Sequence, residues 1–262
     1  MRKIKLTISY DGTNYCGWQI QAKDKTIQHI IRDAISHMTK EKISLVGSSR
    51  TDAGVHALGQ VAHFTTKTNI STQAFVKGIN SLIPEDIAVV EAKEVDLDFH
   101  AQKQAKAKLY QYVIASGAVR LPLMQDRCWQ MRSELNLAAM EKAAKYLVGE
   151  HDFTSFQSTG SSAKDAVREI YSLSLRAQRS NPKDSMGLLR HYVPRNDNFY
   201  TISISGNGFL YRMVRNIVGL LVEIGRGKHS PEFARQVLQA KSKKKAGVCA
   251  PACGLYLIRI DY

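Results

Sequence analysis

The stretch Gly47-Ser48-Ser49-Arg50-Thr51-Asp52-Ala53-Gly54-Val55-His56-Ala57 is the most informative part of this chain. It lies between two short apolar runs, residues 43–46 and 61–64, which are typical of strands. One interpretation is an ordinary turn, in which Asp52 hydrogen-bonds its own backbone and Arg50 is solvated. The other is that a charged pair flanked by small residues has a chemical task. The residues around this loop decide between the two.

Composition and charge favour a soluble chain with an anionic partner. The chain has 262 residues, 44% of them hydrophobic, enough for one large domain or two ordinary ones. The net charge is +14, and most of it lies in residues 96–262, where 25 Lys and Arg stand against 14 Asp and Glu. Because no basic amphipathic helix stands out, this charge predicts a nucleic-acid partner before a membrane.

The cysteines and the apolar runs predict a reduced, cytoplasmic protein. We expect all four cysteines to be reduced, without a disulfide or a metal site, because only two of them are close in sequence: Cys16, Cys128, Cys249 and Cys253. No apolar run approaches the roughly 18–20 residues that span a bilayer. The first residues lead directly into an alternating strand pattern rather than into the apolar core of a signal peptide.

The first part of the chain has the element order of a ferredoxin-like fold. Apolar residues alternate over residues 4–10, which predicts a strand. Thr26 is expected to cap a helix over residues 27–38, and Ser71 a second helix. The inward positions of the second helix are predicted to be Ala74, Phe75, Gly78, Ile79 and Leu82. With strands at residues 43–46, 61–64 and 87–95, the order is strand, helix, strand, strand, helix, strand.

The second part repeats this order. Strands are expected at residues 109–115, 167–175, 199–205 and 255–260, and a buried helix at residues 209–224. Two more helices are expected, one from Asn136 to Leu147 closed by Gly149, and one starting at Ser230-Pro231. The fold class is therefore α+β, with two ferredoxin-like halves at residues 1–103 and 104–262. Their mainly antiparallel sheets are expected side by side, with a long cleft between them.

Residues 176–198 form a longer connection than two neighbouring strands need. The segment is basic and contains Pro182 and Pro194. Unstructured connections longer than about 12–15 residues are uncommon in compact domains. We predict a flexible, dispensable insertion here; an RNA-binding arm is the alternative.

Several blocks of the sequence resemble the tRNA pseudouridine synthase A family. The matching blocks follow one another in order along almost the whole chain: Tyr10-Asp11-Gly12-Thr13-Asn14-Tyr15, Gly17-Trp18-Gln19, Arg50-Thr51-Asp52-Ala53-Gly54-Val55-His56-Ala57, Phe99-His100-Ala101, Tyr110-Gln111-Tyr112, Asp152-Phe153-Thr154-Ser155-Phe156, Met213-Val214-Arg215-Asn216-Ile217-Val218-Gly219 and Gly254-Leu255-Tyr256-Leu257. The resemblance implies the pseudouridine synthase fold, with a catalytic and RNA-binding cleft between the two halves. It also implies isomerisation of uridine to pseudouridine in the anticodon stem-loop of tRNA. It also implies a homodimer and no cofactor or metal.

The resemblance assigns four catalytic residues. Asp52 takes the position of the family's aspartate, a carboxylate that can act as a nucleophile. Attack at C1′, addition to uracil C6 and a glycal route all remain open. Arg50 either keeps Asp52 ionised or wedges in where the uridine leaves the helix. Tyr110 offers a ring and a hydroxyl to the uracil, or is a core aromatic. Arg215 is a candidate partner of Asp52, or part of a surface pair.

Further residues are expected to bind the substrate. Besides Tyr110, these are Leu255, His100, Gln102, Lys103, Lys164 and Arg168. Leu255 matches an apolar residue beneath the substrate, although a plain strand core would also place a leucine there. The family tends to have Arg-Phe where this chain has Gln102 and Lys103, so one contact is weakened or moved to Lys103. His56 is interpreted as loop packing, with a general base as the alternative.

One departure affects the loop itself, and two other functions compete with isomerisation. Ser49 stands where the family usually has glycine, which puts the local loop geometry in question. A non-catalytic tRNA-binding or tRNA-folding module of the same fold would also be basic. A carboxylate-based glycoside hydrolase normally needs a second catalytic carboxylate, for which no candidate is evident.

Overall fold

The computed structural model describes residues 1–160, 165–179, 198–242 and 247–262. The chain divides into two compact units. The first comprises Met1–Lys108 together with Tyr256–Tyr262, and the second comprises Leu109–Leu255. The boundary predicted at residues 103/104 differs from this division chiefly in the last strand, which clusters with the first unit.

The first unit has the predicted ferredoxin-like order. Its elements are β1 (Arg2–Tyr10), α1 (Ile27–Thr39), β2 (Val46–Gly47), β3 (His56–Thr66), α2 (Thr72–Leu82) and β4 (Ile87–Val95). The strands lie in the order β4-β1-β3, all antiparallel, and β2 pairs with β3. This arrangement confirms the split pattern expected from the sequence.

The strand β3 has two partners on one edge. Val46 and Gly47 of β2 lie opposite His63 and Ala62, towards the end of β3. At its start, residues 56–57 pair in parallel with residues 256–257 of β10 (Leu255–Asp261). The residues of the sequence loop therefore run directly into a strand that is paired from its first residue.

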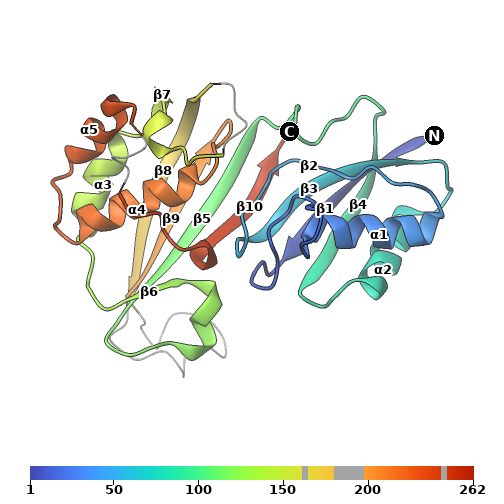
Figure 1. The fold of residues 1–262 in the computed structure, drawn as a ribbon, viewed down its shortest axis with the longest axis horizontal. Helices are drawn as coiled ribbons and strands as arrows, with labels where there is room; N and C mark the ends of the chain where they lie inside the picture. Colours follow the sequence, from blue (N-terminus) through green and yellow to red (C-terminus); the bar gives the residue numbers. More distant parts are fainter. Residues whose placement is uncertain (161–164, 180–197, 243–246) are drawn as a thin grey trace. The chain divides into compact units, whose positions relative to one another are not determined.

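The core of the first unit follows from the alternation in β1. Ile4, Leu6 and Ile8 are fully buried, because side chains of one parity on a strand share a face. The helices α1 and α2 lie beside each other against the sheet (Figure 1). The rings of Phe64 on β3 and Phe75 on α2 meet edge to face at 5.3 Å. Burial of such aromatic rings dominates the stability of a core.

The two helices of the first unit differ in how they begin. The Ser71 hydroxyl accepts a hydrogen bond from the Ala74 amide at 3.2 Å, as the sequence predicts. Thr26 occupies the N-cap position of α1 but makes no side-chain capping bond, so its predicted role is wrong. Ala74 and Leu82 are exposed rather than inward; Leu82 is the last residue of α2.

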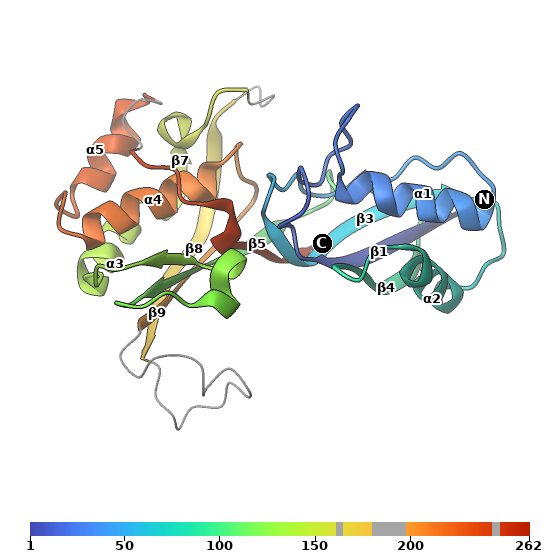
Figure 2. The same cartoon turned by 60° about the horizontal axis from the view of Figure 1, so that its bottom comes forward.

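The second unit contributes further strands, which helices cover. Its strands are β5 (Ala107–Ser116), β6 (Trp129–Met131), β7 (Gly149–Asp152), β8 (Val167–Arg179) and β9 (Asn198–Gly206). They lie in the order β5-β9-β8-β7, and β6 pairs with β5 in parallel. The helices are α3 (Leu137–Lys145), α4 (Met213–Gly225) and α5 (Phe233–Ala240). Figure 2 shows α4 with α3 and α5 near it.

The helices of the second unit are shorter than their sequence patterns. α3 stops at Lys145 rather than Leu147, although Asn136 caps it as predicted, through the Ala139 amide. α4 begins at Met213, because Arg212 before it has a left-handed φ of 58°. α5 begins at Phe233 rather than at the predicted Ser230-Pro231. In α4, almost every residue is buried, which confirms the predicted buried helix.

The segment 176–198, predicted as a long insertion, belongs in part to two strands. Residues 176–179 continue β8, and Arg179 pairs with Asn198 at the start of β9. The insertion predicted over residues 176–198 is therefore wrong at both ends. The remaining residues, 180–197, lie outside the described part of the chain.

The described residues contain free thiols and no helix suited to a bilayer. All four cysteines are free. No helix in the described ranges is long and apolar enough to cross a membrane. Within those same ranges, no group of three or more His, Cys, Asp or Glu residues could hold a metal ion.

Candidate active site

The loop that carries Asp52 is held by the segment that follows β1. The Trp18 amide donates to the Thr51 carbonyl at 3.1 Å, and the Gly54 amide donates to the Tyr15 carbonyl at 3.4 Å. The hydroxyls of Tyr10 and Thr51, both buried, are 2.7 Å apart. Asp52 thus lies between two backbone anchors from one neighbouring segment.

Two glycines allow this close approach. A Cβ on Gly12 would overlap the carbonyl oxygen of Val55, and a Cβ on Gly17 would lie 2.5 Å from that of Thr51. Gly17 also has a φ of +87°, which side chains rarely adopt. The Gly residues of the opening block are therefore required by backbone contact with the Asp52 loop.

The other end of the loop is fixed by His56. The Gly12 amide donates to His56 Nδ1 at 3.1 Å, and the imidazole stacks on the Tyr256 ring at 4.7 Å. Asp11 Oδ1 lies 3.1 Å from the same nitrogen. His56 is only 3% exposed. This burial favours the packing role over the general base.

Ser49 is accommodated without strain. Its backbone amide and carbonyl are both bonded by the side chain of Gln60, at 3.3 and 2.7 Å. Among the described residues other than glycine, positive φ values occur only at Lys40, Arg212 and Lys241. Serine in place of glycine therefore leaves the loop in an ordinary conformation.

The two charged residues of the loop differ in exposure. Arg50 is exposed, whereas Asp52 is half-buried. Asp52 starts a turn in which the Val55 amide donates to its carbonyl at 3.2 Å, and Gly54 within the turn has a φ of 76°. A half-buried carboxylate on a fixed backbone has a defined position, which a nucleophile requires.

The second unit carries Tyr110, Arg215 and Leu255. Tyr110 on β5 is 7% exposed and meets the ring of Phe209 edge to face at 5.3 Å. Arg215 is in the first turn of α4, and its Nε donates to the Ala250 carbonyl at 2.8 Å. The Ala250 amide in turn donates to the Arg215 carbonyl at 3.1 Å, so these two residues are joined twice. Leu255, the first residue of β10, is buried.

The predicted RNA-binding residues fall into two groups. His100, Gln102 and Lys103 form one turn, in which the amides of Gln102 and Lys103 both lie 3.3 Å from His100 Nδ1. Gln102 and Lys103 are exposed. Arg168 on β8 is 3.0 Å from Asp165, and Lys164 lies outside the described residues.

The structure thus groups some predicted residues and adds others. In the first unit, Arg50 and Asp52 share one loop and His100, Gln102 and Lys103 share one turn. The sequence did not assign supporting roles to Tyr10, Gly12, Gly17 and Gln60. The spacing of small and aromatic residues in the opening block was the available signal, but the contacts themselves are tertiary.

Comparisons with known proteins show the family of this chain. A sequence model of the family described as tRNA pseudouridine synthase matches residues 6–102 and 143–262. These ranges include Asp52 and Arg215, whereas Tyr110 lies in the gap between them.

Three relatives match over 100% of both chains, and each is named tRNA pseudouridine synthase A. The chain is 45% identical to the one from Ruminiclostridium cellulolyticum, 44% to the one from Acetivibrio thermocellus and 42% to the one from Thermoanaerobacter sp. (strain X514). Because the family model matches most of the chain and these relatives match it over their full length, this chain belongs to the tRNA pseudouridine synthase family, a family of isomerases.

Proposed function

We propose that this chain converts uridine to pseudouridine in the anticodon stem-loop of tRNA, with the Asp52 carboxylate as the nucleophile. The observation that carries the proposal is a half-buried aspartate on a loop whose backbone is fixed on both sides, in a chain of this family. The glycosidic C1′–N1 bond breaks, the uracil turns, and a C1′–C5 bond forms. The proton on C5 is released and N1 gains one, so the reaction is an isomerisation.

Arg50 is proposed to act on the departing base. Its guanidinium is exposed two residues from Asp52, so it can reach RNA without leaving a buried partner. Extruding a base from a helix costs a few kcal/mol. A planar cation that fills the vacated space offsets part of that cost, because guanidinium groups stack on bases.

Tyr110, Arg215 and Leu255 are proposed as further residues of the reaction. The Tyr110 ring is fixed by Phe209, so it can stack on a base in one orientation. Arg215 is held by the bond from its Nε to the Ala250 carbonyl, so its guanidinium has a defined position from which it can stabilise charge. Leu255 supplies apolar surface for the uracil.

RNA binding is proposed to involve His100, Gln102, Lys103, Lys164 and Arg168. Exposed Gln102 and Lys103 share a turn, so one segment of phosphate backbone can contact both. The net charge of +14 supports a polyanionic substrate. We also propose a homodimer in the cytoplasm, on the family resemblance; sedimentation of the purified chain tests the dimer, and a single-copy mass contradicts it.

The test is the isosteric variant Asp52→Asn. We expect it to bind tRNA nearly as the wild type does and to form no pseudouridine, because the amide keeps the shape and loses the nucleophile. Site-resolved pseudouridine mapping on a tRNA pool measures the product. Asp24→Asn, at an exposed position outside the loop, is the matched control and is expected to keep full activity.

Two outcomes contradict parts of the proposal. Product from Asp52→Asn excludes the nucleophile role. Tight binding of tRNA by the wild-type chain without any product favours the non-catalytic tRNA-binding module instead.

A further inference from the structure

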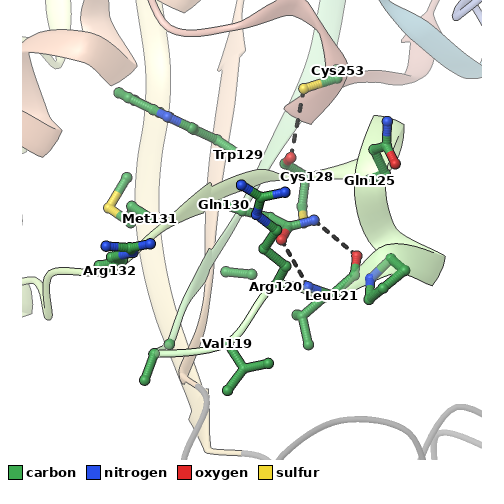
Figure 3. A pocket seen from close by; sticks show the side chains of 14 residues that line it. Val119, Arg120, Leu121, Gln125, Cys128, Trp129, Gln130, Met131, Arg132 and Cys253 are labelled. Carbon is green, nitrogen blue, oxygen red and sulfur yellow. Dashed lines mark hydrogen bonds between the residues drawn. The ribbon is translucent and has the colours of Figure 1, made fainter.

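A pocket of about 670 Å³ lies at the end of β5 in the second unit, far along the strand from Tyr110. The segment after β5, with β6, forms most of its wall, and Cys253 contributes from before β10 (Figure 3). Volumes of about 300–1,000 Å³ are typical of small-molecule sites. Most of this wall falls between residues 102 and 143, outside the ranges that the family model matches.

The wall of the pocket is fixed by hydrogen bonds rather than by loose chain. The Gln130 side chain bonds both the amide and the carbonyl of Leu121, each at 2.9 Å. The Gly117 amide donates to the Met131 carbonyl at 3.0 Å. The Cys253 thiol lies 3.5 Å from the Cys128 carbonyl. The pocket is therefore formed before any ligand binds, which lowers the entropic cost of binding.

The lining has the chemistry of a nucleotide site. Arg120 and Arg132 contribute two exposed guanidinium groups, and none of the 14 residues that line the pocket is acidic. The half-buried Trp129 adds an indole ring. Its centroid lies 6.3 Å from that of the Tyr112 ring, and the two rings meet edge to face at an interplanar angle of 82°. Guanidinium groups bind phosphates, and aromatic rings stack on unpaired bases.

We propose that this pocket binds one unpaired nucleotide of the RNA substrate, with its base on Trp129 and its phosphates on Arg120 and Arg132. This inference rests on the proposed function, since it takes tRNA as the ligand. Ala115, which lines the pocket, is five residues from Tyr110 along β5, or about 17 Å in an extended strand. The nucleotide held here is therefore a different one from the uridine that contacts Tyr110.

The experiment uses the fluorescence of the full chain, which has only two tryptophans. Trp18 is 1% exposed, so a quencher added from solution acts on Trp129. We expect tRNA and a short oligouridylate to quench the emission, because a stacked base contacts the indole directly. Heparin, a polyanion without bases, is expected not to quench. Uridine monophosphate distinguishes a free nucleotide from an RNA strand as the ligand.

Three variants assign the signal. Trp129→Phe should remove the quenching. Arg120→Gln combined with Arg132→Gln should lower the affinity for tRNA about tenfold and make that affinity less dependent on salt. Trp129→Leu should weaken binding about tenfold through the lost stack. Arg127→Gln removes one charge from the same segment outside the lining, so it is the matched control for each of the single variants Arg120→Gln and Arg132→Gln.

Several results overturn the proposal. Equal quenching by heparin, or a loss of tRNA affinity in Arg127→Gln equal to that in each of the single variants Arg120→Gln and Arg132→Gln, would mean that only general charge is sensed. Unchanged tRNA affinity in Trp129→Leu would exclude the stack. Because these readouts need no turnover, they stay interpretable if Asp52→Asn unexpectedly forms product.

Discussion

The α-carbon of Gly17 faces the carbonyl oxygen of Thr51 so closely that an added methyl group would lie 2.5 Å from it. We expect Gly17→Ala to displace Thr51 and, with it, the adjacent Asp52. The change should lower the rate of pseudouridine formation at least tenfold and destabilise the fold by about 1–3 kcal/mol. Rates on a tRNA pool and denaturant unfolding measure the two effects.

A second glycine separates backbone strain from steric displacement. Gly160 has a φ of +88°, nearly that of Gly17, but an added Cβ would meet no atom of the described residues within 4 Å. Gly160→Ala should therefore carry only the strain of the left-handed region, about 1 kcal/mol, with normal activity. Equal loss of activity in both variants would show that contact with Thr51 is irrelevant.

Two buried serines are expected to respond to alanine in opposite directions. The Ser49 hydroxyl is buried and has no hydrogen-bond partner among the described residues. Ser49→Ala should therefore be neutral or stabilise the chain by up to about 1 kcal/mol, because an unpaired polar group is removed. The measurement is the free energy of unfolding in urea.

Ser155 is the matched comparison for Ser49. Its hydroxyl donates to the Val237 carbonyl and accepts from the Ser242 amide at 2.9 Å, and the residue is fully buried. Ser155→Ala should destabilise the chain by about 1–3 kcal/mol. Destabilisation by Ser49→Ala of the same size would indicate that the Ser49 hydroxyl also has a partner.

His63 gives the stability a dependence on pH. Burial, with smaller contributions from His100 and Lys3, lowers the pKa of His63 from 6.5 to about 4. The unfolded chain therefore binds this proton first as the pH falls. The free energy of unfolding therefore has its full value, as far as His63 is concerned, above pH 6.5. It falls by up to roughly 3 kcal/mol as the pH drops from about 6.5 to 4.

The variant His63→Asn tests this dependence. The asparagine oxygen can replace Nδ1, which accepts from the Ala101 amide at 3.2 Å, but it does not titrate. The decline of unfolding free energy over that pH range should become shallower in this variant. His37→Asn, at an exposed position, should leave the slope as in the wild type. Identical slopes in all three chains would exclude His63 as the cause.

The thiols should react with alkylating reagents in a fixed order. Burial raises the pKa of Cys128 to about 12, from an ordinary value of 9, and the residue is 2% exposed. Its thiolate fraction at neutral pH is then about a thousandfold smaller than that of an ordinary thiol. Mass spectrometry after brief alkylation should find exposed Cys16 labelled and Cys128 unlabelled until the chain is unfolded. Comparable early labelling of both would contradict the burial of Cys128.

The sequence predicted the elements that carry a clear period. The alternation in β1 and the spaced apolar residues of α1 each specify a face, so type and place followed directly. Strands β6 and β7 were not predicted, because they are three and four residues long and too short for a pattern. The start of α4 was predicted at residue 209, because the apolar pattern already includes Leu210. The helix begins at Met213, because Arg212 has a left-handed φ that interrupts it.

The sequence predicted the reacting residues of the candidate site, but not the contacts that hold the Asp52 loop in place. The motif around Asp52 pointed to the loop, and the resemblance assigned its role. The contacts that fix the loop, such as Gly17 with Thr51 and Gln60 with Ser49, join residues distant in sequence. No local pattern records such a contact, because a tertiary approach leaves no periodic signal.

The pairing of residues 56–57 with residues 256–257 has a consequence for synthesis on the ribosome. The strand that follows the Asp52 loop gains this parallel neighbour, and His56 gains the Tyr256 ring, only after about 200 further residues have been translated. Until then, the start of β3 has an unpaired edge and the histidine lacks its stacking partner. The nascent chain therefore carries Asp52, the proposed nucleophile, on a loop that lacks part of its support, and this support is complete only once β10 has been translated.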